Sequence, residues 1–581
     1  MNKNTPRVPY LKNWKIPYSD KIFRVIQEFS LTEKVVFFFF VTLLCISAVM
    51  LLWRVNKSFL VEVPEYGGSL TEGILGSPRF INPLLAISDI DRDLTSLVYS
   101  GLLKTDPDGA LVPDLAQSYT ITDDGRTYTF KLKDNVHFHD GVKVTADDVV
   151  FTIEQIKDPL LKSPRKTNWD GVTVNKIDDT TIEFSLHQPY SPFIQNLTLG
   201  ILPKHIWKTA TADEFPFSQY NIKPVGSGPY KITNIAYTSG GLPSEYTFSS
   251  FHSYALGRPY IDTITVKAYP NEKDIIDAFR NGDVQSIYGI TPQKLSGVPS
   301  DSDMVMVAPL PRVFGVFFNQ NMAPVLVNKE VRMALSMATD KKQIVDTVLG
   351  GYGQSIIHAI PPKILAETEG TRVTEEDIAD AKALLEKNGW KLNDDGIYQK
   401  TDKKQTTLLQ FSLSTSAAPE LKAVAQMLQE QWRKIGAQVD IKIFEVGDLN
   451  QNIIRPRKYD ALLFGEVIGR DLDLYPFWHS SGRVDPGLNI ALYTSLRVDK
   501  ILEDIRRTTD GSQQEVLYKK FNTEIESDLP AIFIYSPYFI YIVPNNIHNI
   551  HLGQLTTPGE RWNGIHTWYI ETSNVWKLFA K

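Results

Sequence analysis

The most restrictive feature of this sequence is one long apolar run close to its beginning. Val35 to Trp53 contains no Asp, Glu, Lys or Arg over nineteen residues. A helix rises about 1.5 Å per residue, so the run nearly matches the roughly 30 Å hydrocarbon core of a bilayer. As a helix inside a soluble protein it would need apolar cover on every side. The run therefore predicts one transmembrane helix, which we place at residues 35–55.

The charges before this run predict its orientation. Residues 1–34 carry seven Lys and Arg but only three Asp and Glu. By the positive-inside rule, these residues form a cytoplasmic tail and the rest of the chain lies outside the cell membrane, as an extracellular or periplasmic ectodomain. A cleaved signal peptide would have a shorter tail and a small-x-small exit. A lipoprotein signal would need a small residue before Cys45, which instead follows Thr-Leu-Leu.

Length and composition limit what the ectodomain can be. After a spacer at 56–65, no second apolar run approaches the ~18 residues of a span, and the remainder is too long for one core. The net charge of −6 argues against binding to nucleic acid. No His-Glu-x-x-His, Gly-x-Ser-x-Gly or phosphate-loop motif occurs. We therefore expect neither an enzyme nor a bound cofactor.

Local patterns predict a mixed α/β ectodomain. Asp123-Asp124-Gly125 has the composition of a hairpin turn, and capping residues predict helices that begin after Thr145, Asp340 and Thr374. Glycines 350, 351 and 389 are expected to end the last two of these helices. Alternating apolar residues predict strands at 128–132, 182–186, 264–268 and 439–443.

Several ordered sequence blocks resemble a known receptor family. The longest block runs from Val98 to Thr152 and contains the motif Phe138-His-Asp-Gly141. Over residues 70–570, the blocks resemble bacterial extracellular solute-binding proteins of family 5, which include oligopeptide, dipeptide and nickel receptors. The other blocks are Phe80 to Leu84, Leu202 to His205, Pro224 to Tyr230, His252 to Tyr260, Phe318 to Leu335 and Asp377 to Trp390.

The resemblance implies a periplasmic-binding-protein-like fold of type II, with two lobes and three subdomains. Lobe 1 is expected at 66–306 plus 527–581, and lobe 2 at 307–526. The chain would cross between the lobes near Pro309-Leu-Pro311 and near Asp528-Leu-Pro530. A ligand that touches both lobes only when they are closed would stabilise the closed form.

The resemblance also directs attention to the segment from Phe464 to Ser480. Peptide receptors of this family place an Asp for the ligand's ammonium group three residues before an Asp-Pro pair. If Asp471-Leu472 stands for that pair, the expected acceptor position holds Ile468. The remaining candidates for an ammonium group are the carboxylates of Asp471, Asp473 and Glu466.

Other residues are weaker candidates. Arg470 is expected to pair with a ligand carboxylate or with a neighbouring Asp. His137 and His139 share a strand face, but the resemblance explains them as part of a turn and no third ligand is evident, so we expect no metal site. For the remaining candidates, core packing or local backbone capping is the competing interpretation; these are Tyr475, Trp478, Tyr99, Phe317 and Asn319.

By resemblance, the expected function is that of the substrate-binding component of an ABC importer. Such a protein would bind short peptides in the interlobe cleft and deliver them to permease subunits, while residues 35–55 hold it in the lipid bilayer. One alternative keeps the fold with another solute, such as a nickel chelate, a sugar or a cell-wall fragment. Another is an anchored sensory receptor without import, which the 34-residue tail favours.

Overall fold

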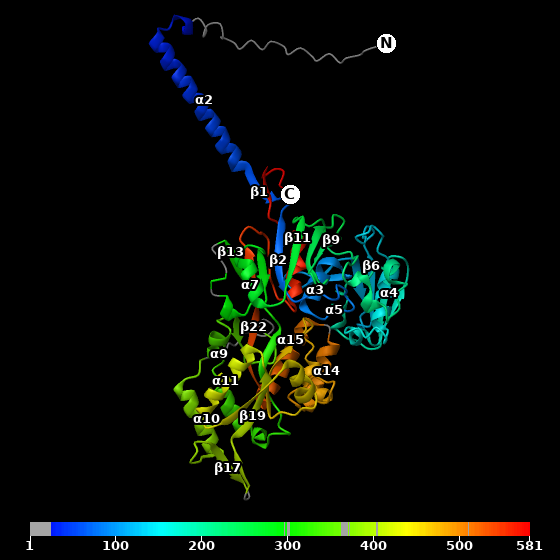
Figure 1. Ribbon diagram of the computed structural model, residues 1–581, viewed down its shortest axis with the longest axis vertical. Coiled ribbons are helices and arrows are strands. Elements are labelled where there is room, and N and C mark those ends of the chain that lie inside the picture. Colours follow the sequence, from blue (N-terminus) through cyan, green and yellow to red (C-terminus); the bar gives the residue numbers. More distant parts are fainter. Residues whose placement is uncertain are drawn as a thin grey trace. The chain divides into compact units, whose positions relative to one another are not determined.

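A computed structural model describes residues 25–295, 297–298, 302–361, 370, 372–402, 405–508 and 510–580. The chain divides into two compact units. The first comprises Met1–Glu65 and Thr572–Lys581, and the second comprises Tyr66–Glu571. Both units appear in Figure 1.

The first unit is built on helix α2, Leu31–Phe59. Ser30 and Glu33 form a reciprocal capping box at its start, and none of its described residues is buried. The helix is longer than the predicted 35–55 because this cap sets its beginning and no breaker interrupts it before Leu60. It is long and apolar enough to cross a membrane.

Two strands follow α2 in the first unit. β1, Leu60–Pro64, pairs antiparallel with β23, Thr572–Trp576. The predicted spacer at 56–65 thus contains the end of α2 and strand β1, and residues 572–581, predicted within lobe 1, group with the first unit. The two strands lie more than 500 residues apart in the sequence, so no local pattern could reveal their pairing.

Within the described residues, twelve strands of the second unit form one mixed sheet. Ten of them lie side by side, and two more pair with its long strand β22. In spatial order the ten are β20 (Gln438–Phe444), β19 (Gln410–Ser416), β21 (Ala461–Val467), β14 (Arg312–Phe318), β22 (Ala531–Pro544), β12 (Ser286–Tyr288), β2 (Ser69–Leu75), β11 (Thr263–Tyr269), β10 (Pro243–Ser250) and β9 (Tyr230–Tyr237); the two others are β13 (Asp303–Pro309) and β15 (Gly353–Ser355).

Strand β22 belongs to both lobes (Figure 1). Its first part pairs with β14 of lobe 2, and its second part pairs with β13 of lobe 1. The chain thus crosses between lobes at Leu310, between β13 and β14, and again near Ser536, whose hydroxyl donates to the Leu310 carbonyl at 2.9 Å. The second crossing was predicted near 528–530; in the structure β22 begins just after it, at Ala531, and continues through the lobe boundary.

A second, smaller sheet completes lobe 1. Its order is β5-β6-β8-β7, and helix α4 places Val149, Ile153 and Ile156 in the same apolar core as this sheet. Gly125 adopts a left-handed φ of 66° in the β5–β6 hairpin, as the turn composition predicted. The elements of this region are β3 (Leu103–Thr105), β4 (Leu111–Pro113), β5 (Ala116–Ile121), β6 (Thr127–Leu132), α4 (Ala146–Lys157), β7 (Val172–Lys176), β8 (Thr181–Leu186), α5 (Phe193–Asn196) and α6 (Lys204–Trp207), with α3 (Asp89–Val98) and α7 (Glu272–Arg280) elsewhere in lobe 1.

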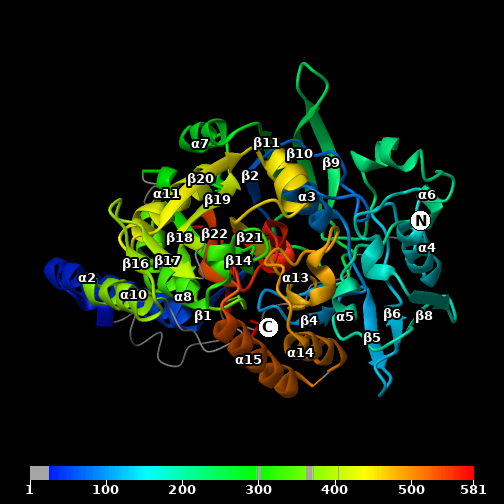
Figure 2. The ribbon, with the colours of Figure 1, turned by 90° about the horizontal axis from the view of Figure 1, so that it is seen from below.

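Lobe 2 surrounds its half of the large sheet with helices. The helices predicted after Thr145, Asp340 and Thr374 are confirmed as α4, α9 and α10. Seen from below in Figure 2, α14 of lobe 2 lies near α5 of lobe 1, consistent with the 3.1 Å hydrogen bond from Ser191 N–H to the Arg506 carbonyl. The elements of lobe 2 are α8 (Lys329–Met337), α9 (Lys341–Val348), α10 (Glu375–Lys387), β16 (Lys391–Leu392), β17 (Tyr398–Asp402), β18 (Gln405–Leu408), α11 (Pro419–Arg433), α12 (Val446–Asp448), α13 (Tyr475–Trp478), α14 (Leu496–Arg507) and α15 (Gly511–Asp528).

Candidate functional site

A pocket of about 670 Å³ lies between the two lobes, and we call it the interlobe pocket. Lobe 1 contributes the loop before β7 and the segment from the end of β8 to α5. Lobe 2 contributes the loop after β21, the start of α13 and one side chain of α14. Its polar lining residues include Asn168, His187, Gln188, Tyr190, Asn196, Asp471, Asp473 and Arg506.

Asp471 is the available carboxylate of this pocket. Among the described residues, the only hydrogen bond that its oxygens accept is from the Asp473 N–H, at 3.5 Å. Burial, together with the neighbouring Asp473 carboxylate, raises the pKa of Asp471 to about 6. A partly buried carboxylate without a cation of its own is a natural acceptor for a ligand ammonium group.

Asp473 lines the same pocket but is already paired. Arg506 donates to its two oxygens at 2.9 and 2.6 Å, and the Tyr190 hydroxyl of lobe 1 donates at 3.2 Å. The Arg506 guanidinium also lies 3.8 Å from the ring centroid of Tyr475. Asp473 and Tyr475 therefore hold Arg506 in place, and Asp473 joins α14 to lobe 1.

Arg470 also connects the lobes. Its Nη2 donates to Glu560 Oε2 at 2.5 Å and to the Gln554 carbonyl at 2.7 Å, both in lobe 1. The sequence predicted that Arg470 would bind a ligand carboxylate or a neighbouring Asp. The carboxylate it contacts is instead that of Glu560, 90 residues away in the chain. With the Tyr190–Asp473 contact, this ion pair holds the lobes together.

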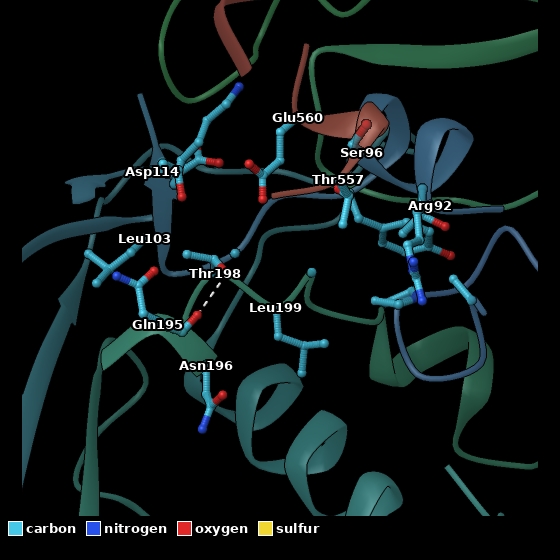
Figure 3. A pocket seen from close by; sticks show the side chains of 18 of the residues that line it. Arg92, Ser96, Leu103, Asp114, Gln195, Asn196, Thr198, Leu199, Thr557 and Glu560 are labelled. Atoms are coloured by element: carbon cyan, nitrogen blue, oxygen red, sulfur yellow. Dashed lines mark hydrogen bonds between the residues drawn. The ribbon is translucent and has the colours of Figure 1, made fainter. Parts of the chain in front are cut away.

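A second pocket, of about 310 Å³, lies within lobe 1 (Figure 3), and we call it the lobe 1 pocket. Asn168 and Asn196 line both pockets and hydrogen-bond to each other, so the two spaces adjoin. Figure 3 shows Asp114 and Arg92 on opposite sides of the lobe 1 pocket, with Glu560 on the wall between them. Charged side chains thus line the pocket on both of its sides.

Two arginines of the lobe 1 pocket are poorly paired. The Arg165 guanidinium donates to no acceptor in the described part of the chain, and burial together with nearby Arg92 lowers its pKa. Arg92 reaches only Asp89, at 3.4 Å, and its buried Nε has no partner among the described residues. Two guanidinium groups with unused donors can hold an anionic group such as a carboxylate. Sequence reasoning missed this pair; a basic cluster at Lys162, Arg165 and Lys166 was the only available signal.

The opposite side of the lobe 1 pocket is also polar and buried. Lys104 donates to the Tyr254 hydroxyl at 3.0 Å, and burial lowers the pKa of this lysine. Burial raises the pKa of Asp114, against the attraction of Lys104. Tyr99 lines the pocket as well, and its buried hydroxyl has no partner among the described residues.

Six of the nine predicted contact residues line neither pocket: Arg470 and Tyr475, whose contacts are given above, and four others. Glu466 is buried without a hydrogen-bond partner among the described residues, and this burial raises the pKa of its carboxyl. Trp478 and Phe317 are fully buried in one aromatic cluster of lobe 2. Asn319 donates to the Arg457 carbonyl at 2.9 Å and so caps local backbone. The last three therefore have the packing and capping roles that were their competing interpretation.

Within the predicted turn, His139 is held by backbone groups. His139 Nε2 lies 3.1 Å from the Gly228 carbonyl oxygen, and the Gly226 N–H donates to His139 Nδ1 at 3.3 Å. Burial lowers the pKa of His139 to about 4. Both ring nitrogens of His139 therefore contact backbone groups.

Comparison with known proteins places these features in a family. The family model described as bacterial extracellular solute-binding proteins, family 5 middle, matches residues 110–485. The oligopeptide-binding protein AppA of Bacillus subtilis is 30% identical over 496 residues, which cover 83% of this chain and 89% of that protein.

Solved structures agree with this assignment. AppA from Bacillus subtilis in complex with a nonapeptide superposes with a TM-score of 0.67 at 28% identity, covering 88% of this chain and 100% of that one. NikZ from Campylobacter jejuni in complex with Ni(L-His) gives a TM-score of 0.68 at 26% identity, covering 86% and 99%. The predicted two-lobe α/β fold is thereby confirmed, and the chain belongs to the bacterial extracellular solute-binding proteins of family 5.

Proposed function

We propose that this chain is a membrane-anchored receptor that binds short peptides between its lobes and delivers them, unaltered, to the permease subunits of an ABC importer. The observation that carries the proposal is the open carboxylate of Asp471 in the interlobe pocket, which adjoins a pocket with two poorly paired arginines. A peptide presents an ammonium group, a carboxylate and backbone polar groups, and the two pockets together offer partners for each.

The ammonium end is assigned to Asp471. Its carboxylate accepts one long hydrogen bond from backbone, whereas the neighbouring Asp473 is committed to Arg506 and Tyr190. A ligand cation would offset the desolvation cost of the ionised carboxylate, which raises the pKa of Asp471. The carboxylate of the ligand is assigned to Arg92 and Arg165, in place of Arg470.

The contacts between the lobes support capture by closure. Arg470 and Asp473 join lobe 2 to lobe 1 at the rim of the interlobe pocket. Residues between the lobes are accessible to a ligand only after these contacts open, so a ligand that bridges the lobes stabilises the closed form.

The anchor is assigned to α2. The helix is apolar along its charge-free segment, and its Ser30 cap follows a basic tail. We infer that it stays uncleaved and that the second unit acts outside the cell, in keeping with the extracellular solute-binding family to which the chain belongs.

Ligand identification tests this function. The full-length protein is purified in detergent, and small molecules released by denaturation are identified by mass spectrometry. We expect short peptides, and calorimetry should then show weaker binding of N-acetylated and C-amidated versions of one such peptide. Asp471→Asn should cost about 1–3 kcal/mol of binding free energy for the free amine, and the exposed Asp395→Asn should cost nothing. Recovery of only a nickel chelate or a sugar would contradict the peptide assignment.

A further inference from the structure

The C-terminal strand returns to the end of α2. In the β1–β23 ladder, Pro64 lies opposite Thr572 and Leu60 lies opposite Trp576. Since β1 leads away from α2, the antiparallel β23 runs back toward it. The Lys577 N–H then donates to the Phe59 carbonyl, the last residue of the helix, at 2.8 Å.

The segment after β23 stays at this end of the ladder. The N–H groups of Phe579 and Ala580 donate to the Trp576 carbonyl at 2.7 and 3.2 Å, so the chain turns there. The rings of Phe59 and Trp576 stack with their centroids 6.2 Å apart. Figure 1 shows the red segment that follows β23 next to β1 and the end of α2.

This turn exposes large apolar side chains. Relative exposures are 84% for Leu578, 72% for Phe579, 52% for Phe59 and 50% for Trp576. Exposure of such a cluster to water is unfavourable, and an apolar or interfacial environment would bury it. Nothing in the described part of the first unit covers these side chains.

The charge and position of the cluster indicate which environment covers it. Phe59 is six residues beyond Trp53, the last residue of the charge-free run, so it lies about 9 Å above the hydrocarbon edge of an upright helix. Headgroup regions extend over roughly 5–8 Å on each side of a bilayer. Side chains of a helix tilt toward its N-terminus, so the Phe59 ring reaches back from the helix end toward this layer. The basic residues Arg54, Lys57 and Lys577 lie at this end of the ladder, whereas the Glu62 carboxylate, farther along β1, accepts a hydrogen bond from the Thr572 hydroxyl.

We propose that Trp576–Ala580 is a second membrane-contact segment, which inserts its apolar side chains into the headgroup region of the leaflet where α2 emerges. The occupant is the lipid bilayer itself: Trp and aromatic rings favour this region, and Lys577, Lys57 and Arg54 face lipid phosphates. The inference rests on the proposed anchor role of α2, because α2 sets the height of the segment above the bilayer.

The single cysteine of the chain makes a direct test practical. In a Cys45→Ser background, full-length protein carrying Leu578→Cys is labelled with an environment-sensitive fluorophore and reconstituted into nanodiscs of zwitterionic and anionic phospholipid. Lipids with a spin-label quencher near the headgroup should quench the label at 578 several-fold more than a label at Glu65→Cys, an exposed position at the far end of β1. The emission at 578 should also shift to the blue relative to 65.

The outcomes separate this inference from the anchor. A label on native Cys45, inside the charge-free run, should be quenched by deeply placed quenchers; if it is not, the anchor assignment fails. If Cys45 is quenched but 578 and 65 are quenched equally weakly, only the second membrane contact is overturned. Self-quenching or crosslinking at 578 without lipid quenching would show that a second copy covers the cluster, and would likewise overturn it.

Discussion

Arginine side chains pair with carboxylates in two regions of this molecule with very different surroundings. In the core of lobe 1, Arg561 has no exposed surface and contacts Glu72 and Asp93, whose carboxylates also accept from Tyr541 at 2.6 Å and Tyr288 at 2.5 Å. At the cleft, Arg470 and Arg506 keep partial contact with solvent and bind carboxylates near the lobe boundary.

The difference separates fixed parts of the molecule from parts that open. The Arg561 cluster joins β2, α3, β12 and the lobe 1 part of β22, and its carboxylates have no access to water, so removing the arginine leaves uncompensated buried charges. The Arg470 pair joins residues of different lobes, and water can replace each partner as they separate. Such a pair suits a contact that forms and breaks in each binding cycle.

The largest expected effect tests the fixed region. Arg561→Met leaves Glu72 and Asp93 buried without a cation, so we expect the free energy of unfolding to fall by about 3–5 kcal/mol. Chemical denaturation of the full-length protein in detergent measures this change. The control is Arg497→Met, which removes an exposed pair with Glu524 at 3.7 Å and should change stability by less than about 1 kcal/mol. Equal effects would remove the distinction between the regions.

The next effect tests the breakable region. Arg470→Met removes two charge-assisted hydrogen bonds between the lobes, worth roughly 1.5–3 kcal/mol. We expect a ligand Kd raised about tenfold or more and a larger radius of gyration of the ligand-free protein by X-ray scattering. Arg455→Met is the matched control, because its pair with Asp485 lies at 3.8 Å within lobe 2. If the Arg470→Met protein stays as compact as the wild type, Arg470 does not hold the lobes.

The outcome of the sequence predictions depends on whether the interacting residues lie near each other in the sequence. The helices after Thr145 and Thr374 were predictable because each cap lies three residues from its partner, in Thr145–Asp148 and Thr374–Asp377. The pairing of β1 with β23 and the shared strand β22 were not, because neither pattern is local.

The site shows the same limit. The resemblance of this segment pointed to Asp471, whose carboxylate the structure leaves open. For Arg470 the expected partner was a ligand carboxylate or a neighbouring Asp, and its partner Glu560 is 90 residues away. The unpaired state of Arg165 depends on what surrounds it in three dimensions, so the sequence carries no mark of it.

A smaller effect concerns Asp471 in the interlobe pocket, whose contribution to stability depends on pH. The pKa of Asp471 is raised to about 6, mainly by burial, so between pH ~4 and ~6 the folded protein binds more protons than the unfolded chain. Its contribution to stability therefore falls as pH rises through this window and is fully unfavourable above it. Asp471→Asn should then raise the free energy of unfolding of ligand-free protein by about 1–2 kcal/mol at pH 7.5, with little gain at pH 4.

The same substitution should affect binding in the opposite direction. The ionised carboxylate is the form that holds an ammonium group, so wild-type affinity should fall as pH drops below about 6, and the Asp471→Asn protein should bind weakly at every pH. Calorimetric titration with one co-purified peptide at several pH values measures both trends. A variant that is neither more stable nor weaker in binding would remove Asp471 from the site.

The smallest effect compares a pocket hydroxyl with a core hydroxyl. Tyr99, in the lobe 1 pocket, has a buried hydroxyl without a partner among the described residues, whereas Tyr230, in the core, donates to the Ile261 carbonyl at 2.9 Å. Removing an unpaired buried hydroxyl should stabilise, and removing a paired one should leave a carbonyl unsatisfied. We expect Tyr99→Phe to gain up to about 1 kcal/mol and Tyr230→Phe to lose about 1 kcal/mol in ligand-free denaturation. If both variants lose stability equally, the Tyr99 hydroxyl is satisfied in the ligand-free protein, and the lobe 1 pocket holds fewer unmet hydrogen-bonding groups for a ligand than we infer.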